Sequence, residues 1–117
     1  MNLSLQHKNA LICGSTQGIG FAIAKELALL GAHCTLVARN EDSLQQAIAQ
    51  LDMSMHQQHR YLVADFSNNE QVKERIQQFA KEHTIHILVN NTGGPPAGKI
   101  TDAKDQDFLS ALHLHLI

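Results

Sequence analysis

The chain has 117 residues, a formal net charge of −2 and a sequence pI near 6.4. This length is enough for one domain with a buried core, and no cluster of Lys or Arg marks a nucleic-acid-binding surface. The polar residues 1–8 lack the apolar stretch of a signal peptide, and no apolar run in the sequence reaches membrane-spanning length. We therefore expect a single-domain cytoplasmic protein without nucleic-acid or membrane partners.

A glycine-rich turn joins the first predicted strand, residues 10–13, to a predicted helix at 21–30. Its sequence is Cys13-Gly14-Ser15-Thr16-Gln17-Gly18-Ile19-Gly20. Such a turn can bind a dinucleotide, because the backbone can approach the pyrophosphate and the helix N-terminus offers free N–H groups. A helix-capping loop without a ligand is the alternative. The predicted pyrophosphate contacts are Gly14, Ser15, Gln17, Gly18, Ile19 and Gly20.

Strands and helices alternate along the rest of the chain. The hydrophobic pattern predicts the following elements: strands at 33–38, 61–64 and 85–89, a helix at 41–51, and a helix that starts within 67–70 and buries Val72, Ile76, Phe79 and Ala80. Helices between successive strands require parallel pairing, and the continuous apolar run at 87–89 is typical of a strand covered on both faces. The pattern therefore predicts a doubly wound α/β fold with a parallel sheet.

The cysteines and histidines could in principle form reactive or metal sites. Cys13 and Cys34 fall in predicted buried strands, and we expect both to pack as small apolar side chains with free thiols. The histidines form three closely spaced pairs: His56/His59, His83/His86 and His113/His115. A bound metal ion usually needs a third and a fourth ligand, which the sequence does not identify. We therefore expect no metal site, and histidines that lie mostly in solvent or loops.

Arg39 follows the second predicted strand, 19 residues after Gly20. An acidic residue near this position would bind the adenosine ribose of NAD. The guanidinium of Arg39, with Asn40 beside it, instead suits a 2′-phosphate, to which it can donate planar, charge-assisted hydrogen bonds. The sequence therefore favours NADP over NAD, and a solvated arginine at a strand end is the alternative.

Two more strand ends carry polar residues. Asp65-Phe66 follows the third strand, where a carboxylate can accept a hydrogen bond from an adenine amino group; taken alone, Asp65 is more typical of a turn or a helix cap. Asn90-Asn91-Thr92-Gly93 closes the fourth strand. The G-x-x-x-G-x-G turn and these strand ends, in this order, resemble the short-chain dehydrogenase/reductase family. The family's usual Thr before the first glycine is Cys13 here, and its Asn-Asn-Ala-Gly motif has Thr92.

The resemblance spans residues 8–117 and implies a Rossmann-like domain that is incomplete relative to the family. It implies that Asp65 and Phe66 contact the adenine, and that Asn91 and Gly93 lie beside the nicotinamide ribose. The loop Asn-Asn-Thr-Gly-Gly-Pro-Pro is similar to that of 3-oxoacyl-acyl-carrier-protein reductase-like members. The implied function is NADP-dependent carbonyl reduction or alcohol oxidation of a small molecule, with residues 1–117 as the NADP-binding part of a longer domain.

The sequence departs from the family where catalysis is concerned. The family's Ser, Tyr and Lys follow the region that this chain spans, so we assign no catalytic residue. Tyr61, the only tyrosine, lies in the third predicted strand and has no Lys four residues later. The resemblance also implies a helix from Phe108 toward the end of the chain, in which His115 takes the position of the family's usual Asn. A solvated or packing histidine is the alternative.

The predicted end of the chain leaves the edge of the fourth strand uncovered, which favours association. We therefore expect Ile117 to end a fragment or a shortened product, and we expect a homo-oligomer by analogy with the family. The alternative function is a non-catalytic nucleotide-binding or subunit-association module, which would use the same exposed edge.

Overall fold

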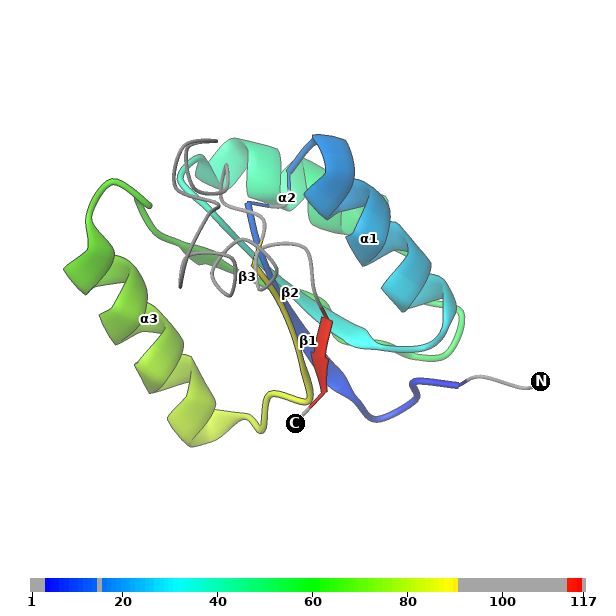
Figure 1. Ribbon diagram of the computed structural model, residues 1–117. Coiled ribbons are helices and arrows are strands. Elements are labelled where there is room, and N and C mark those ends of the chain that lie inside the picture. Colours follow the sequence, from blue (N-terminus) through cyan, green and yellow to red (C-terminus); the bar gives the residue numbers. More distant parts are fainter. Residues whose placement is uncertain (1–3, 15, 91–113, 117) are drawn as a thin grey trace, which may run out of the picture.

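The structure is a computed structural model that describes residues 4–14, 16–90 and 114–116. Its strands and helices alternate as the sequence predicts (Figure 1). In chain order the elements are β1 (Asn9–Cys13), α1 (Gly18–Leu29), β2 (His33–Ala38), α2 (Glu41–Ala49), β3 (Arg60–Val63), α3 (Asn69–Glu82), β4 (Ile87–Asn90) and β5 (Leu114–Leu116).

The strands form one sheet in the order β3-β2-β1-β4-β5. β1 pairs in parallel with β2 and β4, and β2 pairs in parallel with β3. The chain adds β2 and β3 on one side of β1 and then crosses to place β4 on the other side. The strand order therefore reverses between β1 and β4, and ligands of such sheets bind outside the carboxyl ends of the strands at this point.

Helices cover both faces of the sheet (Figure 1). On one face, α1 and α2 bury Leu27 and Leu44 in a cluster that includes Ile12 of β1. On the other face, α3 buries Phe79 in a cluster that includes Leu11. Adjacent residues of β1 belong to different clusters because successive side chains of a strand point to opposite faces. This arrangement confirms the doubly wound, Rossmann-like α/β fold.

The last described strand corrects the prediction of a helix near the end of the chain. Leu114–Leu116 form β5, which pairs antiparallel with β4 and places His115 opposite Leu88. The helix expected from Phe108 does not extend to His115, and the edge of β4 is not uncovered. The sequence 112–116 alternates Leu and His with the period of two that a strand requires. A free strand edge offers backbone groups that such a segment can pair with.

The predicted inner face of α3 is correct except at one position. Val72, Ile76 and Phe79 pack on the core, but Ala80 is exposed. The reason is that α3 meets the sheet through a narrow apolar stripe, and the rest of its surface is polar. Asn68 is the N-cap, and its side chain accepts a hydrogen bond from a backbone N–H of the first turn.

Three histidines bind the backbone near the amino ends of strands: His59 and His86 lie in loops, as expected, and His33 is the first residue of β2. Each accepts a backbone N–H bond at Nδ1: His86 from Asn9 at 2.9 Å, His59 from Cys34 at 3.0 Å and His33 from Gln58 at 2.9 Å. A backbone N–H can only donate, so each Nδ1 is the unprotonated ring nitrogen. These rings therefore help to fix where the strands begin.

The connector between α2 and β3 is anchored by a buried amide. Gln57 is only 1% exposed. Its Nε2 donates to the carbonyl of Ala28 at 2.7 Å, and its Oε1 accepts from the N–H of Met55 at 2.8 Å. Both ends of the amide are thus satisfied, which offsets the cost of its burial.

Both cysteines lie in the core, as predicted. Burial raises the pKa of the Cys13 and Cys34 thiols to about 12, so both stay protonated near neutral pH. Among the described residues, no three His, Cys, Asp or Glu side chains gather in a way that could hold a metal ion. None of the helices in the described ranges is both long and apolar enough to cross a membrane.

Candidate functional site

The carboxyl ends of the parallel strands meet at one edge of the sheet. Cys13 of β1 lies opposite Asn90 of β4, and the N–H of Gly14 donates to the carbonyl of Val37 in β2 at 2.9 Å. The N–H of Ala64, the residue that follows β3, donates to the carbonyl of Ala38, the last residue of β2, also at 2.9 Å. The glycine turn, Arg39 and Asp65 therefore belong to the same edge.

The backbone of the glycine turn favours glycine at position 18. Gly18 has a φ of +67°, in the left-handed region that favours glycine. Among the residues that the structure describes, a Cβ built on Gly18 would meet no atom within 4 Å beyond its chain neighbours and its own helix backbone. The turn thus presents open space next to its backbone, and this space allows a ligand to approach closely.

The start of α1 differs from the starts of the other described helices. Its N-cap, Gln17, makes no side-chain capping bond, and its first turn contains no acidic residue. In α2, Asn40 accepts a hydrogen bond from the N–H of Ser43 at 2.9 Å, and acidic residues occupy the first turn. In α3, Asn68 caps the helix and Glu70 lies in the first turn. Within the described residues, the start of α1 thus lacks the side-chain cap and acidic first turn of α2 and α3, and its N–H groups and partial positive charge suit an anionic acceptor.

The other predicted residues of the turn differ in exposure. Ile19 is 62% exposed, unusual for a large apolar side chain, whereas Gly20 is buried where α1 meets the sheet. An exposed apolar side chain beside the turn could be covered by a bound ligand. Three predicted site residues, Ser15, Asn91 and Gly93, lie outside the described residues.

Arg39 and Asn40 are both exposed at the end of β2. The capping bond to Ser43 uses Oδ1 of Asn40, and the amide nitrogen of Asn40 is the group that can donate to a ligand. The positive charge of Arg39 acts on Asp65, whose pKa it helps to lower. The two predicted 2′-phosphate contacts are thus adjacent, exposed and capable of donating hydrogen bonds.

Asp65 is held in a turn by its neighbours. Its Oδ1 accepts hydrogen bonds from the N–H and the hydroxyl of Ser67, and its own N–H donates to Oε1 of Gln71 at 2.9 Å. The bonds from Ser67 hold the pKa of the Asp65 carboxyl below its ordinary value, and Arg39 lowers it further. This is the turn role that the sequence left open for Asp65.

The sequence prediction missed the two residues that position Asp65. Ser67 falls in the range 67–70 that was predicted to begin a helix, and the sequence prediction gave Gln71 no role. The Asp-x-Ser spacing is the signal that could have identified the turn. The side chain of Phe66 packs in the cluster beneath α3, so its backbone is the part that can face a ligand.

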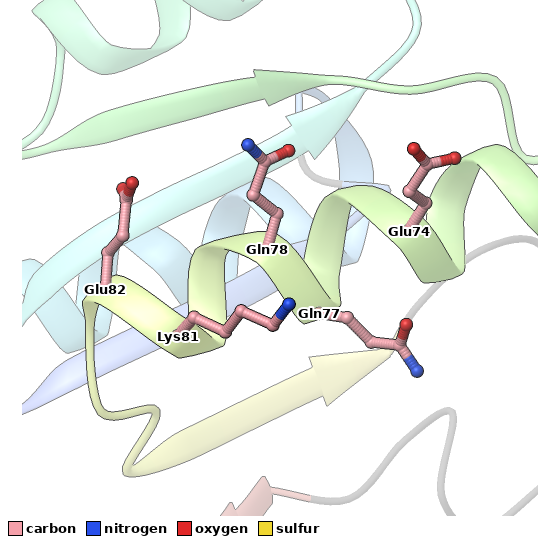
Figure 2. Close-up of a pocket in the computed structure, with 5 residues that line it drawn as sticks. All are labelled: Glu74, Gln77, Gln78, Lys81 and Glu82. Carbon is pink, nitrogen blue, oxygen red and sulfur yellow. The ribbon is translucent and has the colours of Figure 1, made fainter.

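A polar hollow of about 450 Å³ lies along α3 (Figure 2). Its lining residues are Glu74, Gln77, Gln78, Lys81 and Glu82. In Figure 2, Glu74, Gln78 and Glu82 extend from one side of the helix, while Gln77 and Lys81 lie on the other. All five come from a single helix, and none is a predicted site residue. This hollow is therefore the polar outer surface of α3 and is separate from the candidate site.

Comparison with known proteins places these features in a family. Residues 8–117 match the family model of the short chain dehydrogenases. An uncharacterized oxidoreductase of Schizosaccharomyces pombe is 43% identical over 96 residues, which cover 79% of this chain and 28% of that protein. The 3-oxoacyl-acyl-carrier-protein reductase of Chlamydia trachomatis is 30% identical over 113 residues, which cover 96% of this chain and 46% of that protein.

A solved structure shows the same relationship. L-sorbose reductase from Gluconobacter frateurii, solved in complex with NADPH and L-sorbose, has a TM-score of 0.71 and 32% identity to this chain. The match covers 97% of this chain and 44% of that structure. The chain thus spans less than half the length of these relatives. Because the family model matches nearly the whole sequence, the chain belongs to the short-chain dehydrogenase family.

Proposed function

We propose that residues 1–117 form the NADP-binding part of a longer short-chain dehydrogenase domain. The whole protein would reduce a carbonyl group, or oxidise an alcohol, on a small molecule. The observation that carries this proposal is the start of α1, which follows the open Gly18 turn and lacks both a side-chain cap and an acidic first turn. A pyrophosphate offers the acceptors and negative charge that such a helix start favours.

The other contacts with the nucleotide are proposed because α1 begins at the carboxyl edge of the sheet, where the strands that lead to these residues end. The proposed pyrophosphate contacts are Gly14, Ser15, Gln17, Gly18, Ile19 and Gly20. Asp65 and the backbone of Phe66 would contact the adenine, and Asn91 and Gly93 the nicotinamide ribose. Asp65 suits an adenine amino group because its carboxylate is ionised and its position is fixed by Ser67.

The preference for NADP over NAD is proposed from Arg39. Its guanidinium is exposed at the carboxyl end of β2 and can bind a 2′-phosphate through planar, charge-assisted bonds. Asn40 adds a second donor beside it. The similarity to L-sorbose reductase, a structure solved with NADPH, supports the same preference.

A bound NADP would supply or accept the hydride. Reduction of a carbonyl also needs a proton donor for the developing alkoxide. The hydroxyl of Tyr61 donates to Glu41 at 2.8 Å and accepts from Gln45 at 3.1 Å, so it is engaged between β3 and α2. We therefore propose that the groups completing the reaction belong to the part of the relatives' length that this chain does not span.

The test is a fluorescence titration of the purified protein with NADPH and, separately, with NADH. Saturable binding of NADPH that is tighter than binding of NADH is the expected result. Equal affinities would contradict the NADP preference but keep the nucleotide site. Failure of a folded protein to bind either nucleotide would overturn the proposed function.

A further inference from the structure

The amino ends of the parallel strands form a second polar surface, at the edge of the sheet opposite to the glycine turn. A hollow of about 300 Å³ lies there. Its lining residues are His7, Asn9, His33, Gln58, Arg60 and His83. Asn9, His33 and Arg60 are the first residues of β1, β2 and β3. The topology thus gathers, in one place, residues that are far apart in the sequence.

We propose that this hollow, which we call the amino-edge pocket, binds the phosphate group of a small molecule. No acidic residue lines it within the part of the chain that the structure describes; Arg60 is a permanent cation, and His7, His33 and His83 are basic side chains. The site is independent of the nucleotide site, because the two lie at opposite ends of the strands.

The hydrogen bonds already made in the amino-edge pocket leave donors available. Nδ1 of His33 accepts the N–H of Gln58, so Nε2 carries the proton and can donate. Nη2 of Arg60 donates a hydrogen bond to Oε1 of Gln58 at 3.0 Å. This bond uses one of the five N–H groups of the guanidinium. A tetrahedral oxyanion accepts several such bonds at once, and Arg is well suited to bind one in a bidentate manner.

The charges around His33 also favour an anion. The pKa of His33 lies below its ordinary value because of desolvation, followed by the electrostatic influence of Arg60, His59 and His7. The carboxylate of Asp52 interacts with His59, but it is already bound by Ser54 and Gln57. A phosphate group in the pocket would lie beside the permanent positive charge of Arg60, which would attract it.

A metal ion suits the amino-edge pocket less well. Nδ1 of His33 and Nδ1 of His59 already accept backbone N–H bonds and cannot also bind a metal. The guanidinium of Arg60 is a permanent cation with no acceptor. A nucleic acid also fits poorly, because the formal charge of the chain is −2 and the pocket is a single small hollow.

The proposal is tested with sulfate, which stays a dianion between about pH 6 and pH 8, where histidine titrates. Binding is followed by amide chemical shifts of the protein, with sodium chloride at matched ionic strength as the control. We expect saturable shifts at Asn9, His33 and Arg60 that chloride does not reproduce.

Two variants locate the site. Arg60→Gln should weaken sulfate binding about tenfold, as expected for the loss of one charge-assisted contact. His7→Asn should also weaken it, and Asn tolerates the left-handed backbone that His7 adopts, with φ of +67°. Arg39→Gln is the matched control, because it removes a cation from the opposite edge and should leave sulfate binding at these residues unchanged.

Several outcomes would overturn the proposal. These are the absence of saturable shifts at the amino edge, an equal effect of chloride, or unchanged binding in both Arg60→Gln and His7→Asn. An effect of Arg39→Gln as large as that of Arg60→Gln would assign the sulfate to the nucleotide edge instead. NADPH titration of Arg60→Gln should match that of the wild type, so failure of this proposal and failure of the proposed function can be told apart.

Discussion

Ser67 donates two hydrogen bonds to the same carboxylate oxygen of Asp65, one from its backbone N–H at 2.9 Å and one from its hydroxyl at 2.7 Å. Asp52 and Ser54 repeat this arrangement in the connector before β3, at 3.2 Å and 2.6 Å. In both pairs the serine is the main reason that the pKa of the carboxyl is lowered. Only the first pair lies at the carboxyl edge of the sheet, beside Arg39.

Ser67→Ala should raise the pKa of Asp65 toward its ordinary value, because the hydroxyl donor to the carboxylate is lost. The backbone bond and Arg39 remain, so the rise should be partial. Carbon-detected NMR titration of the Asp65 carboxyl measures it. Ser54→Ala is the matched control and should raise the pKa of Asp52 alone. If Asp65 titrates identically in Ser67→Ala and the wild type, the hydroxyl bond is not formed in solution.

Arg39→Asp should weaken NADPH binding by about tenfold to a hundredfold and change NADH binding much less. The variant replaces a donor to the 2′-phosphate by a repelling carboxylate, and NADH has no such phosphate. Fluorescence titration with both nucleotides gives the ratio. Arg75→Asp, at an exposed position of α3, makes the same charge change away from the site and serves as the control. Equal losses for both nucleotides in Arg39→Asp would contradict the assignment.

Gly18→Ala should abolish tight nucleotide binding while the protein stays folded. The added methyl group meets no atom of the described residues beyond its local backbone, so the folding cost is about 1 kcal/mol for the left-handed backbone. The methyl group nevertheless occupies the space proposed for the pyrophosphate. Urea unfolding and NADPH titration measure the two effects separately.

Gly31→Ala is the control for Gly18→Ala, because at position 31 the added methyl group would collide with the protein itself. Gly31 has a φ of +103°, and its Cβ would lie 2.9 Å from Sδ of Met55 and 3.2 Å from the backbone nitrogen of Gln6. The variant should lose more stability than Gly18→Ala, while its folded molecules still bind NADPH. Normal NADPH affinity in Gly18→Ala would show that the pyrophosphate does not lie against this turn.

Acidification should destabilise the protein through His33. Its pKa in the folded state lies below the ordinary value of 6.5, so the unfolded chain binds more protons in this range. The contribution of His33 to stability is therefore present above pH 6.5 and is lost as the pH falls below that value. Urea unfolding at about pH 7.5 and about pH 5.5 measures this loss.

Arg60→Gln provides the check on the cause of this pH dependence. Removing the positive charge that faces His33 should bring the pKa of His33 closer to 6.5 and reduce the loss of stability on acidification. His33→Gln should reduce it as well, because the titrating group is gone. If stability falls on acidification by the same amount in both variants as in the wild type, groups other than His33 cause the loss.

Local patterns in the sequence determined the alternating elements and the position of the glycine turn. Helical spacing predicted that Ile76 and Phe79 face the core, because periodicity depends only on neighbouring residues. The order of glycines and strand-end residues also identified the family, since each motif is a short contiguous stretch. These features need no knowledge of how distant segments pack.

The tertiary structure alone decided the features that depend on distant partners. His86 binds the N–H of Asn9, 77 residues away, so no local pattern could show that this histidine fixes the start of β1. Ala80 is exposed because α3 contacts the sheet through a narrow stripe. The pairing of β5 with β4, and the gathering of histidines with Arg60 at the amino edge, likewise follow from strand order, which only the folded chain specifies.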